Sequence, residues 1–228
     1  MIAKKKRIAK KEIQEDKLVT SLYKSQEFFE KYKQQIFFAV GALAVIVLAF
    51  VWYANKVKED NLEATKELAK MLPIYESGSY QEAIEGKPGT DVLGLKQIVE
   101  NYGSTEQGEI AKVYLANSYY YLGKVDDALK YYESYSGNSN LFKAAAYAGI
   151  ASCNERQGNY EEAAKYFEKA ASVSKFNVQN PKYLLDSGID YIQAQNISKA
   201  KEVFEKLKNN YKKSPLQSEV ERYLASIN

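Results

Sequence analysis

The sequence IAKVYLANSYYYLGKVDDALKYYESY, residues 110–135, recurs with substitutions as AAYAGIASCNERQGNYEEAAKYFEKA, residues 145–170. The two stretches are 35 residues apart, and this offset aligns Ala128 with Ala163. A third copy covers residues 183–207, a further 37 residues along the chain. A repeat of this length indicates a row of equivalent structural units.

Each copy has the pattern of two antiparallel helices joined by a short turn. Apolar residues recur at every third or fourth position, as expected for helices with one buried face. Gly123 and Gly158 are placed to end the first helix, and acidic residues follow where the second helix begins. A single hairpin cannot bury its apolar face alone, so we expect the copies to stack into a right-handed solenoid. Small residues are expected where two helices approach closely, at Ala116, Ala128, Ala151, Ala163 and Ala200, and large ones between hairpins, at Tyr132, Phe167 and Phe204.

This pattern resembles the tetratricopeptide repeat across residues 109–214, and the resemblance implies an all-α solenoid. Residues 55–108 are predicted to contain a linker helix and a divergent first repeat. Pro88 and two glycines interrupt the second helix of that repeat, which is predicted to resume over residues 95–102. Residues 215–228 are predicted to form a C-terminal capping helix over the last hairpin.

Residues 36–54, IFFAVGALAVIVLAFVWYA, contain no charged residue. A helix of this length is roughly 28 Å long, close to the ~30 Å hydrocarbon core of a bilayer. A soluble helix of this length needs a polar face, so we expect an N-terminal transmembrane helix followed by the tetratricopeptide-type helical-hairpin solenoid. About 35 hydrophilic residues precede the segment, which favours a retained anchor over a cleaved signal peptide. The residues expected at the membrane interfaces are aromatic or lysine side chains: Tyr32, Lys33, Trp52, Tyr53 and Lys56.

The distribution of charge predicts the orientation of this anchor. Residues 1–35 form a cationic, partly helical tail with ten Lys and Arg against five Asp and Glu, a net charge of +5. Because the whole chain carries +3, the remainder carries −2. Lysine counts close to the two ends of the apolar segment are equal, so the asymmetry comes from the basic cluster between Lys4 and Lys11. Positive charge is retained in the cytoplasm, so we expect a cytoplasmic N-terminus and a repeat domain outside the cytoplasm.

The composition argues against several classes of chemistry. The chain has no histidine and one cysteine, Cys153, so it lacks the usual nucleophile–base pairs and the common metal-ligand sets. Asp126 and Asp127 follow a hairpin turn, where acids stabilise the start of a helix. The excess of basic residues lies in the tail and not on the folded part, which argues against nucleic-acid binding. We therefore expect no enzymatic activity, no catalytic residue, no metal or other cofactor, and no small-molecule substrate.

The first helix of each hairpin is expected to line a concave groove, as in folds of this kind. Tyr and Arg are enriched at protein interfaces, and a partly apolar groove suits an extended or helical peptide. The predicted partner-binding groove consists of Asn117, Tyr120, Tyr121, Ser152, Glu155, Arg156, Leu185, Ile189 and Ile192. The alternative is that individual members of this set are ordinary solvated positions on helix faces.

The tail KKKRIAKKEIQEDKLVTSLYKSQEFFEKYKQQ, the single anchor and the repeats together resemble the YfgM-type ancillary subunits of the SecYEG translocon. The resemblance implies a single-pass protein of the bacterial inner membrane with a periplasmic repeat domain. It also implies three kinds of protein partner: the SecYEG translocon, a membrane-bound prolyl isomerase, and exported polypeptides that the protein assists or holds.

Two alternatives remain open for the function. One is a passive scaffold for an envelope assembly complex, in which the groove binds one fixed partner. The other is a cytosol-facing chaperone adaptor with inverted topology. The adaptor needs several basic residues in its groove, and of the predicted groove residues only Arg156 is basic.

Overall fold

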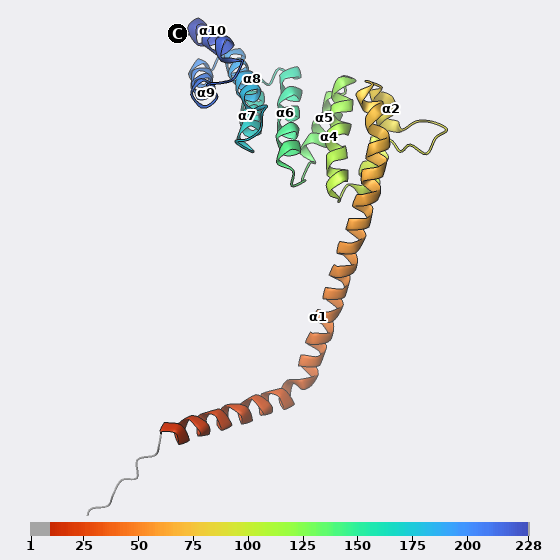
Figure 1. Cartoon of the computed structure of the whole chain (residues 1–228), viewed down its shortest axis with the longest axis vertical. Helices are drawn as coiled ribbons and strands as arrows, with labels where there is room; N and C mark the ends of the chain where they lie inside the picture. The colour runs from red at the N-terminus through yellow and green to blue at the C-terminus, as the bar shows by residue number, and fades with distance from the viewer. Residues whose placement is uncertain (1–9, 228) are drawn as a thin grey trace, which may run out of the picture. The chain divides into compact units, whose positions relative to one another are not determined.

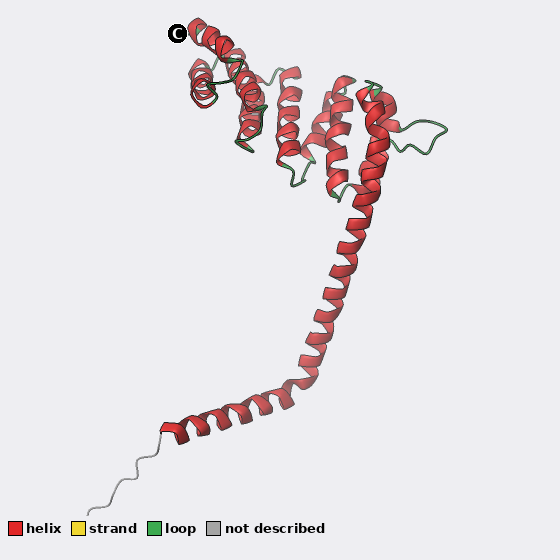
Figure 2. Ribbon diagram, viewed as in Figure 1, coloured by secondary structure: helices red, strands yellow, loops and turns green. Residues whose placement is uncertain are grey.

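The structure, a computed structural model, describes residues 10–227, with side chains from residue 19 onward. The described residues are mostly helical, and their loops are short (Figures 1 and 2). The ten helices are α1 (Lys10–Glu76), α2 (Tyr80–Glu85), α3 (Leu95–Tyr102), α4 (Glu106–Tyr121), α5 (Val125–Glu133), α6 (Asn140–Arg156), α7 (Tyr160–Ser172), α8 (Asn180–Gln193), α9 (Ile197–Asn210) and α10 (Gln217–Ser226).

The chain divides into two compact units, Met1–Lys56 and Val57–Asn228, and α1 contributes to both. Within the first unit, α1 contains a window with a mean hydropathy of 2.6, none of which is buried by protein. Large apolar side chains are exposed along it, including Phe38 at 80% and Trp52 at 67%. This N-terminal helix is long and apolar enough to cross a membrane. The basic residues Lys4, Lys5, Lys6 and Arg7 lie outside the described residues.

The second unit is a row of helical hairpins. Figure 1 shows α4 with α5, α6 with α7, and α8 with α9 following one another in sequence order. The turn inside each of these hairpins contains one residue with a positive φ: Gly123 at 77°, Gly158 at 78° and Gln195 at 59°. Gly78, at 80°, has the same conformation between α1 and α2. The end of α1 and α2 therefore form a fourth, N-terminal hairpin with the same turn.

Small and large residues alternate in the core in the way that the repeats predict. All five alanines predicted at close helix contacts are fully buried. Tyr132, 4% exposed, lies against Gly149 on the next hairpin, where an added Cβ would come within 2.3 Å of the ring. Phe204 of α9 lies against Gly188 of α8 within its own hairpin, where an added Cβ would also come within 2.3 Å of the ring. The aromatic rings therefore fill space that a glycine leaves open on the facing helix.

The helix that begins at Tyr80 is interrupted where the sequence predicts a break. It stops at Glu85 and resumes as α3, and Gly86 pairs with Leu93 across the intervening loop. Gly94 passes so close to α2 that an added Cβ would lie 2.3 Å from the carbonyl oxygen of Ile84. At the other end of the stack, the capping helix is α10, whose Val220 is fully buried against the last hairpin.

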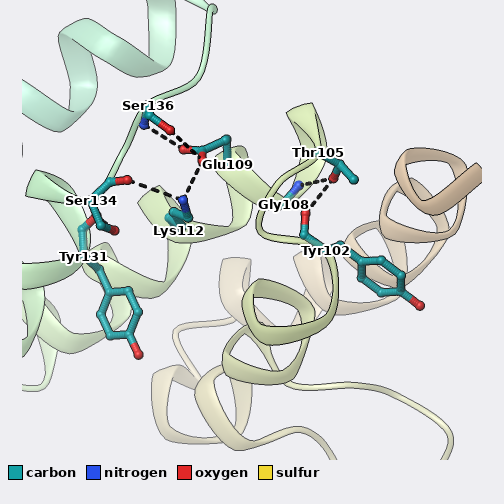
Figure 3. Close-up of polar contacts among 8 residues, drawn as sticks. All are labelled: Tyr102, Thr105, Gly108, Glu109, Lys112, Tyr131, Ser134 and Ser136. Carbon is teal, nitrogen blue, oxygen red and sulfur yellow. Dashed lines mark hydrogen bonds and ion pairs between the residues drawn. The ribbon is translucent and has the colours of Figure 1, made fainter. Parts of the chain in front are cut away.

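A buried polar cluster joins α4 to the segment that links α5 with α6 (Figure 3). The carboxylate of Glu109, a residue 7% exposed, accepts hydrogen bonds from the backbone N–H of Ser136 at 2.7 Å and from its Oγ at 2.9 Å. The Nζ of Lys112 donates to Glu109 at 2.5 Å and to the carbonyl oxygen of Ser134 at 3.3 Å. These bonds hold the linking segment against the start of α4.

The start of α4 is capped by Thr105. Its Oγ1 accepts a hydrogen bond from the backbone N–H of Gly108 at 3.0 Å and donates to the carbonyl oxygen of Tyr102 at 2.8 Å (Figure 3). A Cβ at Gly108 would lie 1.8 Å from that carbonyl oxygen, so the turn between α3 and α4 requires glycine there.

Candidate protein-binding surface

An exposed group of aromatic rings gathers around the end of α4. The ring of Tyr121 is stacked on that of Tyr80 from α2, with centroids 4.7 Å apart and planes inclined by 17°. The ring of Tyr120 meets Tyr121 edge-on at 6.0 Å. Tyr121 is 58% exposed, whereas Tyr80 and Tyr120 are half-buried. Adjacent residues point about 100° apart around a helix, which explains why Tyr120 and Tyr121 differ in exposure.

Arg156, at the end of α6, extends this group. Its guanidinium lies 4.2 Å from the centroid of the Tyr120 ring, within the range of a cation–π contact. The residue is exposed, and no ion pair to it occurs among the described residues. We call Tyr80, Tyr120, Tyr121 and Arg156 the tyrosine–arginine surface. It presents stacked aromatic faces and one unpaired cation.

Asn117 supports this surface from beneath. Its Nδ2 donates to the Tyr75 hydroxyl at 3.1 Å, and its Oδ1 accepts from the Tyr132 hydroxyl at 2.5 Å. Burial raises the pKa of Tyr75 to about 12 and raises that of Tyr132 further. Both hydroxyls therefore keep their protons at neutral pH. Because its side-chain oxygen and its amide nitrogen both have partners, Asn117 positions aromatic residues and has little left to offer a partner.

Ser152 and Glu155, also predicted for the groove, lie on α6 and are half-buried. The carboxyl of Glu155 lies close enough to that of Asp190 of α8, a residue 2% exposed, for the two to interact. Burial, and next the charge of Glu155, raise the pKa of Asp190 to about 8. Burial likewise raises the pKa of Glu155. The centre of the predicted groove is therefore a carboxyl pair that bridges two hairpins, and not a continuation of the aromatic surface.

The prediction for α8 is wrong at Leu185. This side chain is 3% exposed and belongs to the C-terminal core, and the half-buried Ile189 and Ile192 pack against the same core. The reason is that α8 packs against two helices, α7 and α9. Its buried face is therefore wider than that of a helix with one neighbour, and it includes Leu185. Leu185 offers no surface to a partner.

Two further aromatic residues, Tyr80 and Tyr114, lie in this region without having been predicted there. Tyr80 comes from the short helix α2, and its stacking on Tyr121 joins positions 41 residues apart. Tyr114 contacts Phe142 of α6 at 6.0 Å and Tyr75 at 4.9 Å. Tyr114 and Tyr121 are one heptad apart on α4, so helical spacing could have placed them on one face.

The single thiol of the chain lies in the core. Cys153 is fully buried among side chains of α4, α5 and α6, and burial raises its pKa to about 11. A thiol in this environment packs as a small apolar group.

Two tetratricopeptide repeat family profiles match the chain, one at residues 115–176 and the other at residues 183–214. Tetratricopeptide repeats are thus present in the second unit, and such repeats are typical of proteins that bind other proteins. No curated protein matches the chain.

Two crystal structures of the TPR-like repeats of a putative kinesin light chain from Podosopora anserina are similar in fold. They superpose with TM-scores of 0.55 and 0.54 at 16% identity, over 72% of this chain and 84% and 85% of theirs. At this identity the likeness concerns the fold alone.

Proposed function

We propose that this chain is a membrane-anchored protein-binding module whose tyrosine–arginine surface holds an extended segment of another polypeptide. The observation that carries the proposal is the stack of the half-buried Tyr80 on the exposed Tyr121, beside the cation of Arg156. Tyr and Arg are enriched among the residues that contribute most to binding at protein interfaces, and a flat aromatic face accepts many different side chains. An anchored module of this kind suits a partner that passes close to a membrane.

The anchor is the apolar part of α1. Its exposed rings and aliphatic side chains have the composition of a bilayer-spanning segment. Tyr32 and Lys33 precede this segment, Trp52 and Tyr53 lie at its end, and Lys56 follows it. We propose that α1 crosses the bacterial inner membrane once, with the N-terminus in the cytoplasm and the repeats in the periplasm. The support for this orientation is the basic cluster at the N-terminus.

Combined with the resemblance to YfgM-type subunits, this arrangement leads us to propose an accessory role at the SecYEG translocon. Polypeptides leaving a translocon are extended and unfolded, so they expose the apolar and aromatic side chains that a tyrosine face can hold. A membrane-bound prolyl isomerase is the neighbouring partner that the resemblance implies.

Site-specific photo-crosslinking in living cells tests the surface. A photoreactive phenylalanine analogue is placed at Tyr120, Tyr121 and Arg156 in turn, and at the exposed Glu205 on α9 as the matched control. We expect adducts from the first three positions with translocon subunits or with many exported chains. A single stoichiometric partner from another assembly would instead identify a fixed scaffold. Adducts from position 205 alone would refute the proposed surface.

The energetic contribution of the surface is measured separately. Replacing Tyr120, Tyr121 and Arg156 together by Ala should weaken partner binding by ~2 kcal/mol or more, the scale of interface hot spots. Tyr160→Ala removes a tyrosine that is 37% exposed on α7 and should leave binding unchanged. Equal losses for both variants would mean that the effect does not come from this surface.

Orientation is tested by protease added to spheroplasts that carry a tag at Met1. Digestion of the repeats with a protected tag is the expected result. Protected repeats in sealed cells would overturn the periplasmic assignment and favour the cytosol-facing adaptor.

A further inference from the structure

The hairpin stack of the second unit has two different ends, and one of them is where α1 enters it. There, Asn61 of α1 accepts a hydrogen bond from the backbone N–H of Gln107 at the start of α4, at 2.9 Å. The start of α4 in turn binds Ser136, just before α6, through Glu109. Figure 1 shows the loop between α7 and α8 at this same end. We call it the entry end.

The entry end carries an exposed apolar group. Phe176 is 83% exposed and Val178 is 88% exposed in the loop between α7 and α8, and Leu141, in the first turn of α6, is 62% exposed. The three side chains line one shallow pocket together with the polar residues Asn140, Ser174 and Asn177. Large apolar side chains at such exposure, clustered on a loop, indicate a surface that is covered in the working protein.

The loops at the entry end are basic, although Glu106 lies beside them in the first turn of α4. The loops at the entry end are residues 103–105, 134–139, 173–179 and 211–216. They contain three lysines, Lys175, Lys212 and Lys213, and no acidic residue. The second helices begin at the opposite end. The first turns of α5 and α7 are acidic, at Asp126, Asp127, Glu161 and Glu162, whereas that of α9 has no acidic residue. Lysines just after a helix also stabilise it, because the C-terminus of a helix carries a partial negative charge. That effect accounts for the cations but not for the exposed Phe176 and Val178.

We propose that the entry end rests on the anionic lipid headgroups of the membrane that holds α1, with Phe176 and Val178 in the interfacial layer. This inference rests on the proposed membrane anchor. Asn61 lies seven positions after Ala54, and even a fully extended chain of that length spans only about 25 Å. Chain connectivity therefore keeps the start of α4, which Asn61 contacts, within about that distance of the end of the anchor.

The chemistry of the entry end fits a lipid surface. Lysines attract an anionic leaflet, and aromatic and aliphatic side chains bury themselves in the boundary between headgroups and acyl chains. Lys175 lies 5.0 Å from the centroid of the Phe176 ring, so the cation and the ring would reach the interface together. The acidic first turns at the opposite end would face away from the membrane.

The test uses the full chain in nanodiscs of phosphatidylcholine and phosphatidylglycerol in a three-to-one ratio. A fluorophore is attached at Val178→Cys or, as the matched control at the opposite end, at Ser198→Cys. The unsubstituted chain is the labelling blank, because its one cysteine is fully buried. Spin-labelled lipids should quench the fluorophore at position 178 at least twofold more strongly than at position 198. Lys175→Glu, Lys212→Glu and Lys213→Glu together, or phosphatidylcholine alone, should abolish that difference.

Two outcomes would overturn the inference. One is equal quenching at both positions, and the other is crosslinking between copies through position 178, which would identify the covering surface as a second chain. Failure of the anchor is distinguishable from both, since a chain that does not insert would not co-elute with the nanodiscs at all.

Discussion

Replacing Glu109 by Ala should lower the free energy of unfolding of the repeat unit by about 3–5 kcal/mol, the usual cost of removing one partner from a buried ion pair. The substitution removes three hydrogen bonds, from the N–H and Oγ of Ser136 and from Nζ of Lys112. It also leaves the Lys112 side chain, 14% exposed, without its carboxylate. The remaining bond from Lys112 to the carbonyl oxygen of Ser134 is 3.3 Å long and cannot neutralise the charge.

A matched control is available on α7. Glu161 pairs with Lys165 at 3.2 Å, but both side chains are about half exposed, and exposed pairs contribute only ~0–1 kcal/mol. Glu161→Ala therefore deletes the same group from a helical Glu–Lys pair with little expected effect. The assay is urea unfolding of the full chain in detergent, followed by far-UV circular dichroism. Adding Lys112→Met to Glu109→Ala should recover part of the loss, because no unpaired charge then remains.

The reasoning would be refuted if Glu109→Ala cost no more than Glu161→Ala. That result would mean that the segment between α5 and α6 is held by packing alone. It would also remove the argument that this polar cluster fixes how consecutive hairpins meet.

Three further predictions concern the repeats. Ala163→Leu should destabilise the unit by ~1–3 kcal/mol through overpacking of a fully buried contact, and a melting temperature equal to that of the unsubstituted chain would show that the hairpin contact is wrong. Gln195→Gly should stabilise the repeat unit by about 1 kcal/mol, because Gln195 has a φ of 59°, a conformation that glycine adopts without strain. Gly158→Ala, at the equivalent turn, should lower the free energy of unfolding in the same urea titration. The pKa of Asp190 is about 8 in the folded chain, against an ordinary value of 3.8. Between these two pH values the folded state holds a proton that the unfolded chain has released. The free energy of unfolding therefore falls as pH rises from about 4 to about 8. Asp190→Asn should therefore gain in melting temperature relative to the unsubstituted chain between about pH 5 and pH 8, and a pH-independent difference would contradict the assignment.

The sequence by itself determined the elements of this fold. Repeated spacing of apolar and small residues predicted the hairpins, and the glycines at 123 and 158 predicted their turns. The interruption around Pro88 and the resumption of the helix at Leu95 were also predicted correctly. These features depend on backbone conformation and on the apolar face of each helix, which are properties of residues close together in the chain.

Only the tertiary structure decided which faces remain open. The stacking of Tyr80 on Tyr121, the bonds from Glu109 to Ser136 and the pairing of Glu155 with Asp190 each join residues more than 25 positions apart. Periodicity shows that a helix has an apolar face but not how many neighbours will cover it. Leu185 was therefore predicted to line a groove and is instead enclosed by the two helices beside α8.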